Sequence, residues 1–190
     1  MPGYHLAQVN IGRFRAPIDS PIMEGFRARL DPVNALADQS PGFVWRLQTE
    51  DGNATAIRPY EGDERMAINL SVWETLESLR QFVYKSHHVE SLRNREQWFE
   101  PIDGPILALW WVPAGHIPTV LEARERLQHL ERHGPTPHAF TFRSPFPPPG
   151  EPSDVVQRLD AVFCDWASQD HPPKPPAATD SWNSKDQRVI

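Results

Sequence analysis

The stretch that decides the fold is Met66-Ala-Ile-Asn-Leu-Ser-Val-Trp-Glu-Thr-Leu-Glu-Ser-Leu-Arg-Gln-Phe-Val-Tyr84. Over residues 66–72, apolar side chains alternate with smaller or polar ones, which is the period of a β-strand. Further on, Leu76 and Leu79 recur at the spacing of a helix that buries one face. Between the two halves, Ser71-x-x-Glu74 has the pattern of a capping box. The stretch therefore predicts a strand that passes directly into a helix.

Outside this stretch, alternating or wholly apolar runs predict strands over residues 4–11, 43–48 and 106–112. Residues 139–142 are a candidate for one more short strand. The run over 106–112 is apolar on both faces, so we expect both faces of this strand to be covered.

Two more helices are predicted before and after these strands. Ser20-Pro21 predicts a helix start, and Asp31-Pro32 predicts a kink or break, because proline disfavours helical geometry in the residue before it. Thr119-x-x-Glu122 is a second capping box, and it opens an apolar stripe that runs to Leu130. Helical spacing also continues after Ser86 as far as Phe99.

The predicted order is strand, helix, strand, strand, helix, strand, and then another helix. This order predicts an α+β domain of the ferredoxin-like, split βαβ plan, in which an antiparallel sheet carries helices on one face. The other face must then be covered or left to water. Because the strand over 106–112 is apolar on both sides, we predict that two copies pair through their sheets as a homodimer, which is a dimeric α+β barrel.

The chain divides into three parts. Residues 1–150 form the barrel domain, and a proline-rich connector leads into an amphipathic helix over 151–170. Residues 171–190 are proline-rich and polar, so we expect them to be disordered.

Composition excludes several classes of function. The net charge of −6 argues against a nucleic-acid partner, which would require a basic surface. Cys164 is the single cysteine, so neither an intramolecular disulfide nor a multi-thiolate metal site is expected. No apolar run approaches the roughly 20 residues that span a bilayer, and phosphate-binding glycine motifs are absent. We expect a cytoplasmic protein with no membrane partner.

Several runs resemble a bacterial family of unknown function that belongs to the dimeric α+β barrel superfamily, near the antibiotic-biosynthesis monooxygenase type. The most specific are Pro41-Gly-Phe-Val-Trp-Arg46, Asn69-Leu-Ser-Val-Trp-Glu74 through Phe82-Val-Tyr84, and Leu109-Trp-Trp-Val-Pro-Ala-Gly115. The resemblance covers residues 3–150. It implies the fold and the dimer, and it offers possible chemistries: cofactor-free oxygenation of phenols, isomerisation, and haem-dependent degradation or dehydration.

Alternation also predicts a pocket. Four polar residues fall on the predicted cavity-facing side of the strands, and two tryptophans are candidate walls: Gln8, Asn10, Asn69 and Ser71, with Trp45 and Trp110. A mostly apolar pocket with a few converging amides is a common small-ligand site. Alternatively, these polar residues face water or pair at a dimer interface.

His88 is the candidate general base. His87 and His88 are adjacent, so on a helix they diverge by about 100°, and at most one of them points into a cavity. His88 shares a face with Leu92, and its neutral imidazole suits abstraction of a proton near neutral pH. Alternatively, it closes the helix. Tyr84 and His87 are candidate substrate-binding residues. Alternatively, Tyr84 is a half-buried packing residue.

Arg95 is the candidate oxyanion partner, with Trp98 beside it as a wall. The alternative is a solvated helix face, which we favour for Arg93. Haem is disfavoured because the position at which haem-degrading relatives of this fold carry histidine falls near Arg93, leaving His87 or His88 as substitutes. His129 and His133 have a chelating spacing, but no third ligand is marked nearby, so no metal is expected.

Combined with the chemistries that the resemblance implies, these residues favour a cofactor-independent enzyme acting on an aromatic or polyketide-like molecule. His88 would deprotonate the substrate and Asn69 and Arg95 would stabilise the resulting oxyanion, while the tryptophans exclude water. The alternatives are a non-catalytic ligand-binding protein and a haem enzyme.

Overall fold

The computed structural model describes residues 3–88 and 95–152, without the side chains of 84–88, 95 and 96. The strands are β1 (Tyr4–Phe14), β2 (Phe43–Arg46), β3 (Met66–Trp73), β4 (Phe99–Glu100) and β5 (Leu107–Pro113). The helices are a short 3-10 helix, η1 (Pro21–Met23), then α1 (Glu24–Asp38), α2 (Leu76–His88), α3 (Arg95–Trp98) and α4 (Val120–His133). The predicted segments 151–170 and 171–190 lie outside the described residues, apart from residues 151 and 152.

The sheet has the predicted split βαβ topology. Its order is β2-β3-β1, with β5 and the short β4 both pairing to the far side of β1, and all pairs are antiparallel. Because β1 and β2 are each antiparallel to β3, they run parallel to one another with β3 between them. The same relation holds for β3 and β5 around β1. The α+β, ferredoxin-like plan is confirmed.

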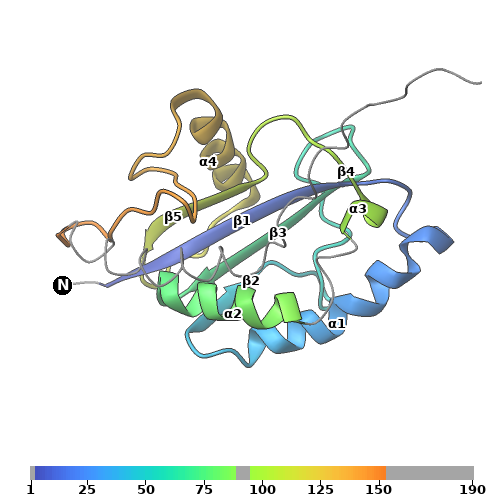
Figure 1. Ribbon diagram of the computed structural model, residues 1–190, viewed down its shortest axis with the longest axis horizontal. Helices are drawn as coiled ribbons and strands as arrows, with labels where there is room; N and C mark the ends of the chain where they lie inside the picture. The colour runs from blue at the N-terminus through green and yellow to red at the C-terminus, as the bar shows by residue number, and fades with distance from the viewer. Residues whose placement is uncertain (1–2, 89–94, 153–190) are drawn as a thin grey trace, which may run out of the picture.

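The helices lie on both faces of the sheet (Figure 1). As predicted for a split βαβ unit, α1 and α2 share one face, where Ala37 and Leu79 pack with Trp73. The helix that follows this unit, α4, packs on the opposite face, where Leu127 joins Leu70 in a separate cluster. The molecule therefore has three layers in this region, with the sheet in the middle.

The position of α4 corrects our argument for the dimer. The strand over 106–112 was expected to need a second sheet because it is apolar on both sides. In the structure, Ala108, Trp110 and Val112 are at most 1% exposed, because they pack with side chains of α4 from the same chain. The apolar face is thus covered without a partner, and a dimer is not shown.

Two local predictions are wrong, each for an identifiable reason. Ser71 does not cap α2, because β3 continues to Trp73 and Ser71 stays in the strand. The cap is Thr75, whose Oγ1 accepts a hydrogen bond from the backbone N–H of Ser78 at 3.0 Å. Secondly, α1 continues through Pro32, so of the predicted kink or break the break does not occur. Pro32 is exposed, so the helix carbonyl that loses its N–H partner there can bond to water instead.

Other elements agree with the sequence to within a few residues. Thr119 caps α4 as predicted, with its side chain accepting from the N–H of Glu122 at 3.1 Å. The expected strand over 139–142 is reduced to isolated bridges, of which one, between Phe140 and Leu109, joins it to β5. Phe99 was expected in a helix, yet it belongs to β4 and pairs with Phe14.

Gly12 shows how closely β1 is packed near β4. A Cβ added at Gly12 would lie 2.6 Å from the ring of Phe99, which is closer than real Cβ atoms approach other atoms. The absence of a side chain at this position therefore lets the aromatic ring lie directly on the strand.

Candidate functional site

A strip of four polar side chains crosses the sheet face that carries α1 and α2. This polar strip consists of Gln8, Asn10, Asn69 and Ser71. The register of β1 and β3 places Gln8 opposite Ser71 and Asn10 opposite Asn69. Residues directly opposite each other on antiparallel strands share a face, so the strip is contiguous.

One end of the polar strip is buried and hydrogen-bonded. Trp73 Nε1 donates to Ser71 Oγ at 3.0 Å, and Ser71 Oγ donates to Gln8 Oε1 at 2.9 Å. Gln8 and Ser71 are 7% and 6% exposed. The chain of bonds uses the Ser71 hydroxyl as both acceptor and donor, and it turns the Gln8 oxygen toward Ser71. This end of the strip is rigid, and the amide nitrogen of Gln8 points away from Ser71.

The other end of the polar strip is open. Asn69 is exposed and lies opposite Asn10 of β1, just past the residues of β3 that pair with β2. Asn10 is half-buried, with its Nδ2 donating to the carbonyl of Ile106 at 3.3 Å. The Asn69 amide is therefore accessible to solvent on the face where α1 and α2 pack.

Apolar clusters close both ends of this face. Beyond the Ser71 end, Leu6, Trp73 and Leu109 pack with α1 and α2. Beyond the Asn69 end, Phe14, Met23 and Trp98 form another cluster. The predicted wall residue Trp98 lies on the expected face, but it is 5% exposed and is held between Phe26 and the Arg29 guanidinium.

The structure does not bring Trp45 and Trp110 to the polar strip, which corrects their predicted place as cavity walls. Both pack on the opposite face, with the cluster that contacts α4. Trp110 is 1% exposed, and its Nε1 donates to Glu122 Oε1 at 2.8 Å. The register pairs Trp110 with Ala7, and Ala7 points away from Gln8.

The remaining predicted residues are placed by their backbone alone. Tyr84, His87 and His88 belong to α2, and Arg95 begins α3. Their side chains lie outside the described residues, as does all of Arg93. Both helices pack on the face of the polar strip, α2 through Leu79 and α3 through Trp98. The assigned roles of these four residues stay predictions.

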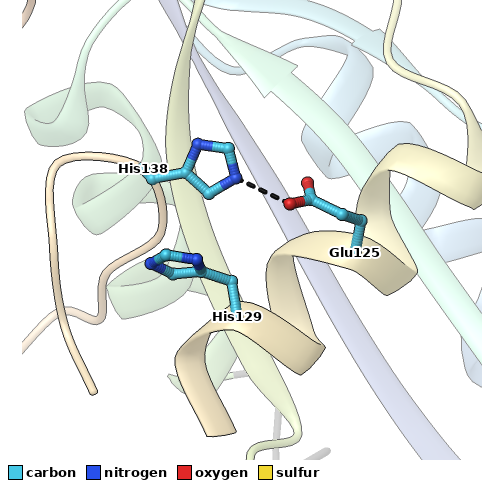
Figure 2. A group of neighbouring side chains, drawn as sticks. All are labelled: Glu125, His129 and His138. Atoms are coloured by element: carbon cyan, nitrogen blue, oxygen red, sulfur yellow. Dashed lines mark hydrogen bonds and ion pairs between the residues drawn. The ribbon is translucent and has the colours of Figure 1, made fainter. Parts of the chain in front are cut away.

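Sequence reasoning missed a second group of side chains, on the opposite side of the molecule. Glu125 and His129 of α4 meet His138, which follows the helix, and one ligand atom from each lies within 4.8 Å of the other two (Figure 2). The ring of His133 lies 4.6 Å from that of His129. The i, i+4 spacing of Glu125 and His129 was visible in the sequence, but no spacing rule indicates His138.

Burial is the first cause that lowers the pKa of His129, and the neighbouring imidazoles of His138 and His133 lower it further. The carboxylate of Glu125 acts in the opposite direction. His129 therefore tends to be neutral near neutral pH.

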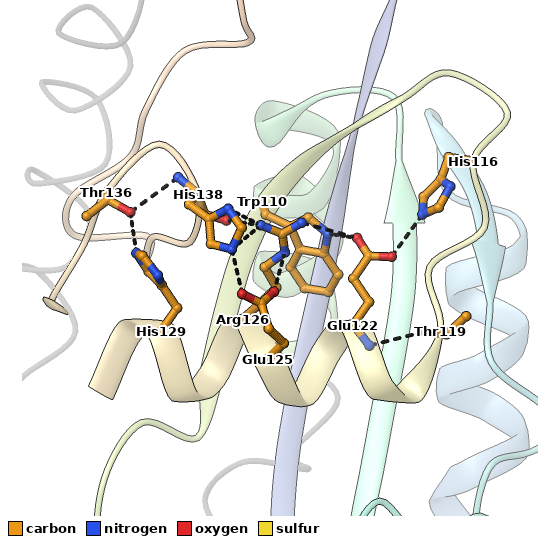
Figure 3. Close-up of polar contacts among 9 residues, drawn as sticks. All are labelled: Trp110, His116, Thr119, Glu122, Glu125, Arg126, His129, Thr136 and His138. Carbon is orange, nitrogen blue, oxygen red and sulfur yellow. Dashed lines mark hydrogen bonds and ion pairs between the residues drawn. The ribbon is translucent and has the colours of Figure 1, made fainter. Parts of the chain in front are cut away.

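A polar network extends from this group along α4 (Figure 3). Glu122 accepts from Trp110 and pairs with His116 Nε2 at 2.9 Å, and Arg126 Nη2 lies 3.5 Å from Glu122 Oε1. Burial raises the pKa of the Glu122 carboxyl, but the bonds from His116 and Trp110 and the charge of Arg126 outweigh it. The pKa is therefore lowered from 4.5.

Residues 5–156 match a family model described as a domain of unknown function, DUF3291. The chain belongs to this family. The resemblance of its sequence to a bacterial family of unknown function is thereby confirmed. No curated protein matches the DUF3291 chain.

Among solved structures, the DUF3291 chain is similar to a mutant of SnoaB, a cofactor-independent oxygenase from Streptomyces nogalater. The identity is 14% and the TM-score 0.37, and the match covers 60% of this chain and 95% of that one. In the described part of the DUF3291 chain, none of the helices has the length and apolar character that crossing a bilayer requires.

Proposed function

We propose that this protein binds a small aromatic or polyketide-like molecule over the polar strip and acts on it without a bound redox cofactor. The observation that carries the proposal is the exposure of Asn69 beside Asn10, on the sheet face where α1 and α2 pack. Accessible polar groups between two apolar clusters suit an organic molecule that carries a few oxygen atoms.

The polar strip is suited to hold one oxygen of such a ligand. The amide N–H groups of Asn69 can donate to a phenolate or enolate oxygen, and they are held by a strand that cannot move independently of its neighbours. Gln8 is fixed by Ser71, and Asn10 by Ile106. Donors that are already oriented stabilise developing negative charge without reorganising.

The proposed reaction begins with removal of a proton by His88 from a phenol or an activated carbon. The electron pair stays on the substrate as an enolate or phenolate, which Asn69 and Arg95 would stabilise. In an isomerisation the proton returns to another atom of the same molecule. In a dehydration it is delivered to the hydroxyl group that leaves as water. A monooxygenase-like reaction would need O₂ as co-substrate: the substrate anion supplies the electrons, one oxygen atom enters the product and the other leaves as water.

A specific observation favours the alternative of ligand binding without turnover. The four residues of the polar strip are three amides and one hydroxyl, which are neutral and do not transfer protons near neutral pH. A binding protein needs only these groups, whereas the enzyme needs His88 in addition. A haem enzyme is the third alternative, and a Soret band in the purified protein would support it.

The test begins with native mass spectrometry of the purified full chain and with binding of phenols and polycyclic aromatic ketones. Asn69→Ala should weaken binding at least tenfold, while the exposed position keeps the free energy of unfolding within about 0.5 kcal/mol. Asn34→Ala, which removes an asparagine from α1, is the matched control and should bind normally. Unchanged affinity in Asn69→Ala would contradict the proposed site.

His88→Ala separates the enzyme from the binding protein. If His88 is the base, the variant should bind the same ligand but lose turnover by a factor of about 10² to 10⁴. Binding without turnover in the wild-type protein, across the whole panel, would favour the binding protein.

A further inference from the structure

We propose that Glu125, His129 and His138 form a binding site for a divalent transition-metal ion, with Zn²⁺ as the best match. Two imidazoles and one carboxylate are the donors that Zn²⁺ takes in open sites, where water completes the coordination. The three ligand atoms already lie within 4.8 Å of one another, so small movements of side chains would bring them around one ion (Figure 2).

The backbone holds the three residues in place from two sides. Glu125 and His129 are one turn apart on α4, so they project from the same face of the helix. His138 sits in a tight turn closed by hydrogen bonds between Thr136 and Ala139, at 2.9 and 3.1 Å. This turn is anchored because Phe140 and Leu109 exchange two backbone hydrogen bonds of 2.8 Å, and Ala139 and Phe140 are fully buried.

His129 also has the outer partner that metal-binding histidines usually have. Thr136 Oγ1 lies 2.8 Å from His129 Nε2, and it accepts from the backbone N–H of His138 at 3.3 Å. A partner on one ring nitrogen fixes the orientation of the ring and leaves the other nitrogen, Nδ1, for the ion. His138 Nε2 is 2.8 Å from Glu125 Oε1, and the Glu125 side chain is 54% exposed, so this pair can open to admit a cation.

Arg126 competes with the metal for this site. Its Nη1 lies 2.5 and 2.6 Å from the two ring nitrogens of His138, nearly equidistant, which is not the geometry of a bond along one lone pair. Figure 3 shows the guanidinium between His138 and Glu122. Its positive charge opposes a cation, and an entering ion must displace it toward Glu122. Removing this charge should therefore strengthen metal binding, an effect that a purely structural cluster would not show.

The experiment is titration of Zn²⁺ into the untagged full chain after treatment with EDTA, followed by calorimetry, with circular dichroism as a check of folding. One ion should bind per chain. His129→Ala and His138→Ala should each weaken binding at least tenfold, and Arg126→Gln should strengthen it several-fold. His116→Ala is the matched control, because it removes another half-exposed histidine that pairs with a glutamate of α4, Glu122. This variant should bind Zn²⁺ as tightly as the wild type.

Two results would overturn the proposal. In the first, His138→Ala is folded and binds Zn²⁺ as tightly as the wild type. In the second, His116→Ala weakens Zn²⁺ binding as much as His129→Ala and His138→Ala do. Substitution with Co²⁺ gives a second readout: visible d–d bands should appear in wild type and be lost in His129→Ala. The site is independent of the polar strip, so Asn69→Ala should bind Zn²⁺ normally whatever its effect on the organic ligand.

Discussion

The two faces of the sheet use the same strands for different purposes. Toward α4, strands β1 and β3 present an aliphatic face, with Val9, Ile68 and Leu70 packed under Leu127. Toward α1 and α2, apolar clusters lie at each end and the polar strip lies between them. Neighbouring residues such as Leu70 and Asn69 thus differ in burial because successive side chains point to opposite faces. One face is therefore packed along its whole length, whereas the other keeps polar side chains between its apolar clusters.

The largest effect should come from the aliphatic face. Leu70→Ala removes a fully buried side chain from the central strand, and the cavity that remains should lower the free energy of unfolding by about 2–5 kcal/mol. Urea denaturation measures this loss. Asn69→Ala, one residue away and exposed, is the control. Similar losses in the two variants would contradict the division between the faces.

A smaller loss of stability is expected where the ring of Phe99 lies on β1. Gly12→Ala places a Cβ 2.6 Å from the ring of Phe99, so the ring or the strand must shift. Overpacking of this kind costs about 1–3 kcal/mol. Thermal unfolding measures it. The double variant with Phe99→Leu should recover part of the loss, and a Gly12→Ala protein as stable as the wild type would show that the ring moves freely.

The polar strip itself should contribute less still. Ser71→Ala leaves the Nε1 of buried Trp73 and the Oε1 of Gln8 without their shared partner, which should cost about 1–2 kcal/mol. Ser71→Thr keeps the hydroxyl and should lose less than Ser71→Ala in the same denaturation experiment. Equal losses would mean that the shape of the side chain, rather than its hydrogen bonds, matters at this position.

The smallest effect on stability should come from the charge of Glu122, which lies beside the aliphatic face. Because the folded-state pKa of Glu122 is lowered from 4.5, ionised Glu122 stabilises the protein above that pH, and the contribution is lost as the pH falls through the folded-state pKa. Glu122→Gln keeps an acceptor for Trp110 but removes the charge. It should cost about 1 kcal/mol at pH 7, and progressively less as the pH falls through the folded-state pKa of Glu122. A difference that is independent of pH would contradict the role of the charge.

Two identical patterns show what the sequence could predict. Thr119-x-x-Glu122 and Ser71-x-x-Glu74 both read as capping boxes, yet only the first caps a helix. Thr119 precedes α4 by one residue, whereas the Ser71 hydroxyl is taken by Trp73 and Gln8 on neighbouring positions of the sheet. A capping motif therefore predicts a helix start only where its side chain is not already hydrogen-bonded to a residue of another element or of the same strand.

The residues of the candidate sites also fall into two groups: those that local patterns place correctly and those that only tertiary contacts place. Alternation alone placed Gln8 with Asn10 and Asn69 with Ser71, and the topology followed from the order of elements. Placing Trp110 required the register of β5 against β1, and grouping His138 with His129 required the path of the chain after α4. Neither is encoded in spacing along the sequence, because both depend on residues that are distant in the chain.

The cover that α4 provides has a consequence for how the protein responds to dilution. Only residues 114–119 separate the end of β5 from the start of α4, so the helix is always near the face it covers. A short tether of this kind keeps its segment at an effective concentration in the millimolar range or above. A second copy would leave that face when the solution is diluted. The tethered helix stays, so this face of the sheet should remain covered at nanomolar as at micromolar protein.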